Sequence, residues 1–481
     1  MYKENKLIAL SNLGNEVIEG ITGFKLDAYL IALEGWRRGL ELKWYRDQSD
    51  LCEMNVLPGR TSGRFFSLSD GNKTHYFFAT RGDKVSNEAA SICRNKSLTK
   101  KLLKKAGINV PIGGSFEDEH ELLRFATKIG YPVVLKPQSG SMGRGVFVNL
   151  QSENELKKAI QQIRRNTEYK ELIIEKFYQG DEYRVYVVGN KVIGAIKRVP
   201  ANVIGDGIHS IRELIEIKNK NRKINPYLSI KPIKIDSQVR DMLKKKGYTL
   251  DSVPEKNEKI FLRNMSNLSQ GGDPIEATDE LTDEVKELAV NALKALPSMG
   301  HGGLDIIVDP DNPNEGTVLE INSKPEISFH LYPLSGNPKD IPSAIIDYYF
   351  PDTINKFKST AFFDYKSILK PLNNRAVEEL KISDAPSTNC FKKTFLVQGK
   401  VINVGYMSYI KRQALKNKLY GECKRDGKNV KITIIGSESG QIDAFKKYIY
   451  DGSHKSVVVK VIEDKLEKIT EPFKIGFEIT N

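Results

Sequence analysis

The sequence has few of the residues that build metal clusters or disulfide frameworks. Its 481 residues include only 4 cysteines and 6 histidines. Cys52, Cys93, Cys390 and Cys423 are scattered without CxxC spacing, which argues against a zinc site and against a disulfide framework. No Ser/His/Asp or Cys/His arrangement is evident among so few histidines. We therefore expect buried or surface thiols, and chemistry that needs no nucleophilic triad.

The sequence also lacks long apolar runs. No stretch approaches about eighteen apolar residues, and residues 1–6 carry charge without the apolar segment of a signal peptide. Its 40 % hydrophobic and 28 % charged content is typical of a soluble globular protein. We expect a cytoplasmic protein without a membrane partner, divided into three or four structural units because 481 residues exceed one core.

Positive charge is in excess, with a net charge of +13. Residues 391–481 hold 18 Lys and Arg against 10 Asp and Glu, without a long basic run or a recognition-helix pattern. A solvated face, or a docking surface for an acidic partner, explains this excess better than specific nucleic-acid binding.

The first ninety or so residues predict an N-terminal α/β domain. Apolar residues between 26 and 36 share one helical face, and Gly39 ends the predicted helix. Strands are predicted at residues 41–45 and 74–80. The domain, over residues 1–94, is expected to help bind a substrate or a second subunit, so a homo-oligomer stays open.

A glycine-rich loop follows the predicted strand 131–137 and precedes another at 146–148. The helix before these strands is expected to begin with Ser115 as N-cap. Glycines let backbone N–H groups approach a phosphate, and Lys136 at the strand end supplies a charge. No helix opens directly after the glycines, so the loop is neither a Walker loop nor a dinucleotide fingerprint. A flexible hairpin turn would explain the glycines but not Lys136 and Arg144.

A break at Gly180 separates the next two predicted strands. Acidic residues flank it, and their oxygens suit hydrogen bonds from an adenine amino group or from ribose hydroxyls.

Two short β-branched segments, 302–309 and 317–325, predict adjacent antiparallel strands joined by a turn. Side chains alternate along a strand, so Glu320 and Asn322 should share one face while Leu319 and Ile321 point into a core. With Asp305 on the partner strand, they form a set of oxygen ligands that suits magnesium. Two ordinary strands with polar residues facing solvent are the alternative.

Together these segments occur in the order and spacing of the ATP-grasp superfamily. Residues 198–214 and 247–272 resemble the ATP-grasp module of cyanophycin synthetases and related bifunctional glutathione synthetases. The resemblance covers roughly residues 95–345 and excludes the other domains of those enzymes, so their substrates are not implied. It implies a two-lobed ATP-grasp fold over residues 95–350, with a nucleotide-binding lobe at about 95–180 and a metal and substrate lobe at about 181–350.

The resemblance also implies roles for individual residues. Those implied to bind ATP are Lys96, Lys136, Ser139, Gly140, Ser141, Met142, Gly143, Glu175, Lys176, Phe177 and Glu182. The two lysines would bind phosphates, Glu175 and Phe177 would lie at the adenine, and Glu182 would bind the ribose. Asp305, Glu320 and Asn322 would hold two magnesium ions, whereas Arg184, Arg198 and Arg263 would bind the acyl-phosphate and Asn267 would begin a loop over the reacting carboxylate.

The reaction implied is an ATP- and magnesium-dependent ligation of a small-molecule carboxylate to an amine, through an acyl-phosphate. Such phosphoryl transfer needs positioning and charge neutralisation more than covalent help from the protein. His301 and His330 lie near the metal hairpin in sequence, where a structural role is commoner than a substrate role.

The last ninety residues show a β-α-β-β-α-β rhythm that predicts a ferredoxin-like domain over residues 391–481, after a linker at 351–390. Residues 398–407 and 419–421 resemble an acylphosphatase. Met407 replaces the family's phosphate-binding arginine and Arg425 its water-positioning asparagine, so activity is not expected. Lys411, one turn along, offers a surrogate charge, but a docking or dimerisation module is the favoured interpretation.

Two other functions stay open beside the ligase. A nucleotide-binding regulatory or scaffold protein would not need all of Lys136, Arg263, Asp305, Glu320 and Asn322. An acylphosphate hydrolase run by the C-terminal domain is disfavoured by Met407 and Arg425. The fold class expected overall combines α/β and α+β domains.

Overall fold

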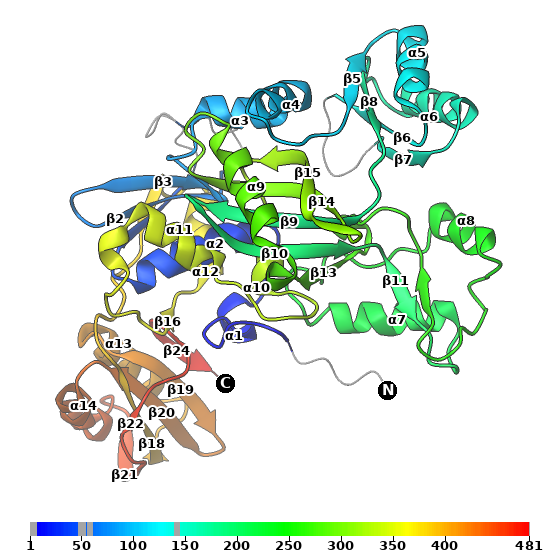
Figure 1. Ribbon diagram of the computed structural model, residues 1–481. Helices are drawn as coiled ribbons and strands as arrows, with labels where there is room; N and C mark the ends of the chain where they lie inside the picture. Colours follow the sequence, from blue (N-terminus) through cyan, green and yellow to red (C-terminus); the bar gives the residue numbers. More distant parts are fainter. Residues whose placement is uncertain (1–6, 47–53, 55–60, 139–144, 481) are drawn as a thin grey trace.

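The computed structural model describes residues 7–46, 54, 61–138 and 145–480. Figure 1 shows a central sheet with a nucleotide lobe above it, an insertion at lower right and a C-terminal domain at lower left. No helix in these ranges is long and apolar enough to cross a membrane.

The N-terminal unit packs helix α2 (Phe24–Arg37) on a five-stranded sheet of order β17-β1-β2-β3-β4. Every strand pair is antiparallel. The predicted helix and both predicted strands are confirmed. The strands are β1 (Glu41–Tyr45), β2 (Phe65–Ser69), β3 (Thr74–Phe78), β4 (Arg81–Gly82) and β17 (Glu379–Lys381), and a short helix α1 (Asn15–Ile18) precedes them.

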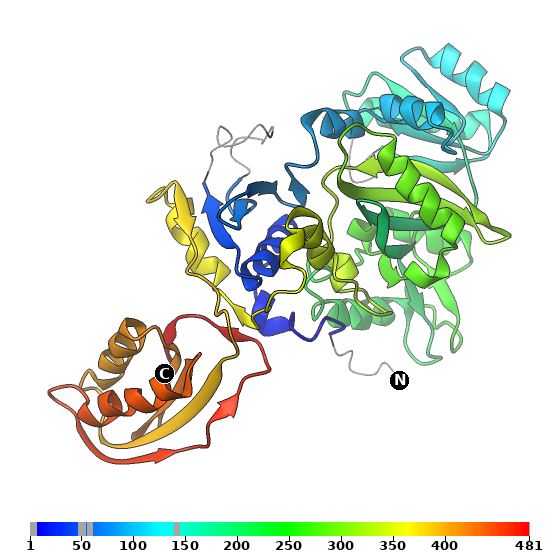
Figure 2. The ribbon, with the colours of Figure 1, turned by 60° about the vertical axis from the view of Figure 1, so that its left-hand side comes forward.

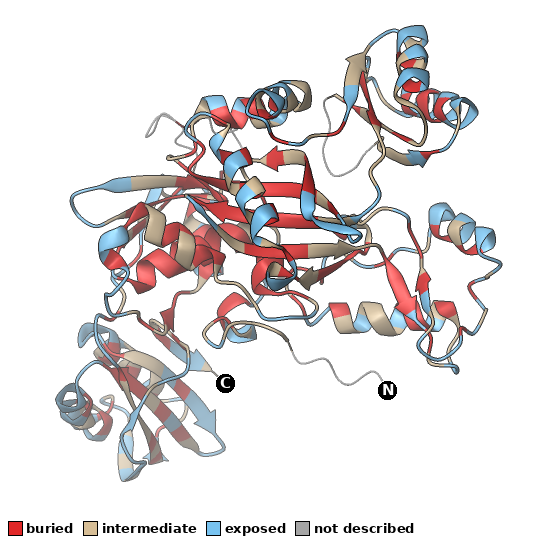
Figure 3. Cartoon of the chain, in the orientation of Figure 1, coloured by how far each residue is buried: buried red, intermediate tan, exposed pale blue. Residues whose placement is uncertain are grey.

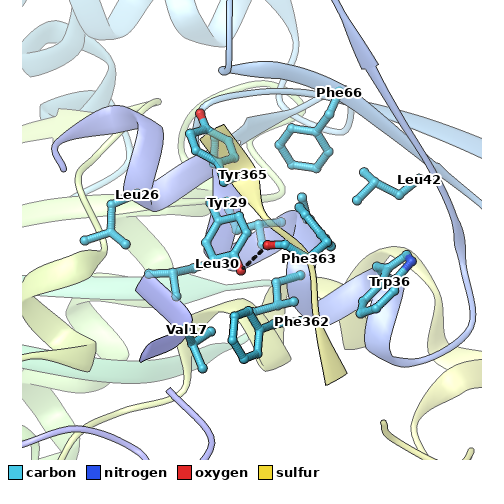
Figure 4. Close-up of a cluster of buried hydrophobic side chains, with 14 of the residues drawn as sticks. Val17, Leu26, Tyr29, Leu30, Trp36, Leu42, Phe66, Phe362, Phe363 and Tyr365 are labelled. Carbon is cyan, nitrogen blue, oxygen red and sulfur yellow. Dashed lines mark hydrogen bonds between the residues drawn. The ribbon is translucent and has the colours of Figure 1, made fainter. Parts of the chain in front are cut away.

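In place of the predicted linker at 351–390, the structure has elements that complete this unit. Figure 4 shows the shared core, where Tyr29 Oη on α2 donates a 3.3 Å hydrogen bond to the carbonyl of Phe363. The Trp36 and Phe363 rings also meet edge to face, 5.2 Å apart. The elements are α11 (Ile341–Tyr349), η4 (Pro351–Thr353), β16 (Ala361–Phe362), α12 (Tyr365–Asn373) and β17. Most apolar residues of 351–390, such as Phe363 and Leu372, are therefore core residues, whereas Ile354 and Phe357 are exposed. The turn-rich stretch near 384–389 connects this unit to the C-terminal domain.

The nucleotide lobe has a four-stranded antiparallel sheet of order β5-β8-β6-β7, with helices α5 and α6 packed on it. Ser115 lies in β5, not at a helix cap as predicted; Asp118 caps α5 instead, accepting 2.8 Å from the Glu121 N–H. The elements of the lobe are β5 (Gly113–Phe116), α5 (Glu119–Ile129), β6 (Val133–Pro137), β7 (Phe147–Leu150), α6 (Glu153–Asn166) and β8 (Leu172–Lys176). The preceding helices α3 (Asn87–Arg94) and α4 (Lys96–Lys105) pack against the central sheet instead, where Ala89, Ile92 and Leu103 join its core.

The central sheet has the order β13-β10-β9-β14-β15, and α9 (Asp283–Lys294) packs on one face. Figure 3 shows its strands as an almost continuous buried layer. The strands are β9 (Asp181–Val188), β10 (Lys191–Val199), β13 (Asp273–Glu276), β14 (His301–Asp309) and β15 (Asn312–Asn322), and the short helices η3 (Thr278–Glu280) and α10 (Ser328–Leu331) flank them.

The predicted antiparallel hairpin is confirmed as β14 and β15, but its register differs from strict alternation. Asp305 pairs with Glu320 and the next pair is Ile306 with Val318, so a bulge skips Leu319. The core contains Val318 and Ile321, whereas Leu319 is only half-buried. The prediction that Leu319 points into the core was therefore wrong, because an extra residue in one strand shifts the alternation.

An insertion between β10 and β13 forms a small lobe with its own core. Strands β11 (Asn202–Ile204) and β12 (Lys259–Phe261) pair there, beside α7 (Ile211–Arg222) and α8 (Ser237–Lys245). The helix η2 (Leu268–Gln270) leads back to the central sheet.

The C-terminal domain has the predicted β-α-β-β-α-β pattern, with strand order β21-β18-β20-β19-β24. Its elements are β18 (Phe391–Lys400), α13 (Tyr406–Lys416), β19 (Tyr420–Asp426), β20 (Asn429–Gly436), α14 (Ser439–Asp451), β21 (Val457–Glu463), β22 (Glu467–Lys468), β23 (Phe473–Lys474) and β24 (Phe477–Thr480). The predicted last strand is split, and β23 pairs in parallel with β16 of the N-terminal unit. Figures 1 and 2 both place this domain far from the nucleotide lobe.

Candidate functional site

The face of the central sheet opposite α9 carries the predicted metal ligands. Asp305 on β14 stands directly opposite Glu320 on β15, and Asn322 Nδ2 donates a 3.1 Å hydrogen bond to Glu320 Oε1. That bond leaves the amide oxygen of Asn322 for another partner. The structure thus brings the three predicted ligands together, and their oxygens fit the preference of Mg²⁺. No group of three or more His, Cys, Asp and Glu in the described ranges could hold a metal.

Two arginines hold Asp305 from neighbouring strands. Arg184 on β9 donates to both carboxylate oxygens, with Nη2 to Oδ2 at 3.0 Å. Arg198 on β10 donates to Oδ1 from Nη2, also at 3.0 Å. Asp305 is only 4 % exposed, and burial alone would raise its pKa, but the two guanidinium groups outweigh burial and hold the pKa below its usual range.

Glu182 extends this network toward the insertion. It accepts a 2.6 Å hydrogen bond from Arg198 Nη1 and another from the Ser266 hydroxyl. Glu182 is half-buried and already accepts hydrogen bonds from two donors, so a ribose hydroxyl that binds here would be a third donor to the same carboxylate.

A second cluster lies in the nucleotide lobe around Glu175. This residue on β8 is 3 % exposed and meets the ammonium groups of Lys136 on β6, at 2.9 Å, and of Lys100 on α4. Burial lowers the pKa of Lys136 to about 8, with Lys96 adding to the effect while Glu320 and Asp305 oppose it. Lys96, which was also predicted to bind phosphates, and the hairpin carboxylates Asp305 and Glu320 are therefore close enough to influence the charge of Lys136.

Other predicted nucleotide residues have structural partners of their own. Lys176 Nζ donates to the carbonyls of Gly130 and Tyr131 at 3.1 and 3.0 Å. The Phe177 N–H donates to the Pro132 carbonyl at 3.0 Å. The predicted loop residues Ser139, Gly140, Ser141, Met142 and Gly143 lie outside the described residues.

Arg263 is not brought together with the other two predicted arginines. It lies on the insertion, where it donates to Asp236 Oδ2 at 2.6 Å and to Gln238 Oε1 at 2.7 Å. Asn267 accepts a 2.9 Å hydrogen bond from the Ser269 N–H and begins η2. Both residues are thus tied to the insertion, whereas the sheet holds Arg184 and Arg198.

The two histidines near the hairpin are completely buried. His301 contacts the hydroxyls of Tyr186 and Tyr349 at 3.0 and 3.3 Å, and burial lowers its pKa to about 4. Burial also lowers the pKa of His330, to about 3, and within the described ranges neither of its ring nitrogens has a hydrogen-bond partner. Both are neutral residues of the interior.

The two altered positions of the C-terminal domain lie on α13 and on β19. Met407 lies on α13 and packs against the domain core. Arg425 is exposed and its Nε donates to the Gly427 carbonyl at 3.2 Å, so it faces its own hairpin turn. Lys411 is half-buried on α13. None of these side chains restores an arginine and asparagine pair.

The three described cysteines, Cys93, Cys390 and Cys423, are free thiols, as expected. Burial raises the pKa of each of them. Cys52 lies outside the described residues.

Sequence reasoning missed Lys100, which completes the lysine cluster. The signal was present in the four-residue spacing from Lys96, because residues at i and i+4 share one face of a helix. A strongly basic helix hides this pair among five lysines, so only burial distinguishes it.

Two family models match the chain. The RimK-like ATP-grasp domain matches residues 93–213, and acylphosphatase matches residues 393–479. Glutathione biosynthesis bifunctional protein GshAB of Mannheimia succiniciproducens is 34 % identical over 306 residues, which cover 60 % of this chain and 40 % of that protein. Cyanophycin synthetase of Trichormus variabilis is 34 % identical over 283 residues, which cover 57 % and 31 %. The chain therefore spans less than half the length of these relatives.

Solved structures give similar matches. A bifunctional glutathione synthetase from Pasteurella multocida has a TM-score of 0.46 and 31 % identity, over 60 % of this chain and 41 % of that chain. Acylphosphatase from Bacillus subtilis has a TM-score of 0.18 and 25 % identity, over 19 % of this chain and 99 % of that chain. On the two family models, both resemblances expected from the sequence are confirmed: the chain contains a RimK-like ATP-grasp domain and an acylphosphatase domain.

Proposed function

We propose that this chain is an ATP- and magnesium-dependent ligase that forms an amide bond between an amino-acid or peptide carboxylate and an amine. The observation that carries the proposal is the set of charges on one sheet face. Asp305 and Glu320 stand opposite each other, and Arg184 and Arg198 donate hydrogen bonds to Asp305. The charges of both carboxylates also act on the ammonium group of Lys136. Alternating anions and cations at this density suit a ligand that brings both phosphates and metal ions.

The ligands in this proposal are assigned by charge and donor type. Asp305, Glu320 and Asn322 would hold magnesium, as two ions, which when bound neutralise the charge of the phosphate chain. Lys136, with a buried ammonium, is suited to the phosphates.

The arginines are suited to the acyl-phosphate. Arg184 and Arg198 present planar guanidinium groups whose N–H donors match phosphate oxygens. Asp305 fixes both of them before any ligand arrives, so little reorganisation is left for the reaction.

The proposed reaction has two balanced steps. A carboxylate oxygen attacks the γ-phosphorus of ATP, and ADP leaves with the electron pair of the broken P–O bond. The amine nitrogen then attacks the acyl carbon, inorganic phosphate leaves, and the nitrogen loses its proton to solvent. Both steps depend on holding the reactants in line, which the residues above do by charge and position.

The relatives support a synthetase, because their names refer to glutathione biosynthesis and to cyanophycin synthesis. Burial raises the pKa of the three described thiols, and His301 and His330 are buried and neutral, so none of these five residues is suited to nucleophilic attack. We place the activity in the cytoplasm, where nucleotide, magnesium and free amino acids occur together.

We assign the acylphosphatase domain a docking role within the chain. Its strand β23 extends β16, and Lys474 forms a 3.3 Å ion pair with Asp364 of the N-terminal unit. Ile435 and Phe473 of this domain are buried in the same core as Tyr29. A domain anchored in this way stabilises the N-terminal unit without chemistry of its own.

A pairwise screen tests the ligase. Amino acids and dipeptides are offered as acid and amine, with ATP and magnesium, and ADP release is measured. We expect at least one pair to give ADP release that requires both substrates and magnesium. Lys136→Ala should abolish this release, whereas Lys101→Ala, which removes an exposed lysine of α4, should not. Full turnover by the Lys136 variant would refute the site.

A further inference from the structure

Lys100 is a largely buried lysine on α4, which packs against the central sheet, and the proposed chemistry has not yet used it. Only 13 % of its side chain is exposed, and its ammonium contacts Glu175. Lys136, 12 % exposed, contacts the other oxygen of the same carboxylate at 2.9 Å. Two largely buried lysine side chains therefore share one carboxylate.

This sharing is costly for a purely structural pair. Lys136 alone neutralises Glu175, so a second buried ammonium adds desolvation and repulsion without a second partner in contact. Burial lowers the pKa of Lys100, and Lys136 and Lys96 lower it further, while Glu320 opposes them. A lysine whose surroundings disfavour its positive charge is expected where a bound ligand supplies a second negative charge for it.

The helix that carries Lys100 adds to the argument. Lys96 and Lys100 lie one turn apart in α4, and Lys96 is in the first turn, where the helix dipole disfavours cations. Like charges at i and i+4 also destabilise a helix. Both penalties disappear if a polyanion binds between α4 and the strand that carries Lys136.

The electrostatic reach of the cluster identifies the side of the lobe that is involved. Glu320 acts on both Lys100 and Lys136, and Asp305 acts on Lys136. The two lysines thus lie within electrostatic range of the carboxylates proposed to hold magnesium, which suits a ligand that carries several negative charges in a row.

We propose that Lys100 is a third lysine that binds the phosphate chain of a nucleoside triphosphate, and that Glu175 positions Lys100 and Lys136 side by side for it. The proposal rests on the ligase function proposed above. It also assigns Glu175 a positioning role in place of the adenine contact that the family resemblance implied. Lys100 then pairs with phosphate oxygens, while Glu175 stays under both lysines.

Calorimetric titration with a non-hydrolysable ATP analogue and magnesium tests the proposal on the full chain. Lys100→Met should weaken binding roughly 10- to 100-fold, the loss expected for one hydrogen bond to a charged group. The matched control Lys101→Met removes an exposed lysine one residue away and should bind as the wild type does. Equal affinities of Lys100→Met and wild type would overturn the inference and leave the ligase proposal standing.

A second readout separates phosphate binding from a structural role. Because Lys100 is held partly neutral, it should take up a proton when phosphate binds, so the binding enthalpy near neutral pH should depend on the ionisation enthalpy of the buffer. This dependence should fall in Lys100→Met and persist in Lys101→Met. A dependence unchanged in Lys100→Met would contradict the proposal.

A double variant guards against misfolding. Lys100→Met with Glu175→Gln removes the buried carboxylate together with its second lysine partner, so it should fold even if the single variant does not. The proposal expects its binding to stay weak. Recovery of wild-type affinity would show that Lys100 serves only as a counter-ion of Glu175, and a wild type that binds no nucleotide would instead refute the ligase proposal itself.

Discussion

Asp305 and Glu320 face each other across the same hairpin, yet the structure predicts opposite outcomes when each loses its charge. Asp305 is 4 % exposed and accepts hydrogen bonds from two guanidinium groups. Asp305→Asn keeps the shape but turns an amide donor toward arginine donors. Breaking such a buried ion pair costs about 3 to 5 kcal/mol.

Glu320 is less buried than Asp305 and accepts fewer hydrogen bonds among the described residues. It is half-buried and accepts one hydrogen bond, from Asn322 at 3.1 Å, which a glutamine oxygen can also accept. Glu320→Gln should therefore change the free energy of unfolding by less than about 1 kcal/mol. Its turnover should still fall at least roughly 100-fold, because an amide is a poorer ligand for magnesium than a carboxylate.

Two assays on the same preparations distinguish these outcomes. Thermal unfolding should show a loss of roughly 6 to 20 °C for the unit that contains Asp305→Asn, on the basis of about 2 to 4 °C per kcal/mol. Glu320→Gln should melt with the wild type while its ADP release is lost. Equal losses of melting temperature in both variants, or full turnover in Glu320→Gln, would refute the division of roles.

Three further predictions concern pH and the C-terminal domain. Lys136 binds phosphate only when protonated, so nucleotide affinity measured by titration should fall as pH rises through about 8, and affinity that rises there would contradict its lowered pKa. Burial, and then the charge of Glu326, raise the pKa of Asp27 to about 7, so its charge should destabilise the fold as pH rises from about 4 to about 7. Asp27→Asn should then raise the melting temperature more at about pH 8 than at about pH 5, and an equal change of melting temperature at both would argue against it. Met407→Ala should leave phosphate release from a model acyl-phosphate within roughly two-fold of wild type, because its thioether donates no hydrogen bond; a large loss would revive the hydrolase reading.

The sequence predicted the hairpin that carries Asp305, Glu320 and Asn322 because local rules decide its pairing. A turn between two β-branched segments specifies the pairing, and alternation then places Glu320 and Asn322 on one face. The bulge at Leu319 could not be foreseen, since one extra residue in a strand leaves no compositional mark. The ferredoxin-like pattern was predicted for the same local reasons.

Long-range packing explains what the sequence did not predict. The segment 351–390 resembled a linker because its elements are short and each is incomplete alone. Phe363 and Leu372 are buried only because α2 and the first strands, hundreds of residues earlier, supply the other half of their core. Likewise, Lys100 differs from its neighbouring lysines only through its contact with Glu175, 75 positions away.

Transfer of oxygen-18 tests the central claim most directly. Once the screen has identified a substrate pair, the acid is labelled in its carboxylate and the phosphate released is analysed by mass spectrometry. If ATP activates the acid as an acyl-phosphate, one labelled oxygen should appear in inorganic phosphate for each ADP formed. Unlabelled phosphate accompanying amide product would contradict the account.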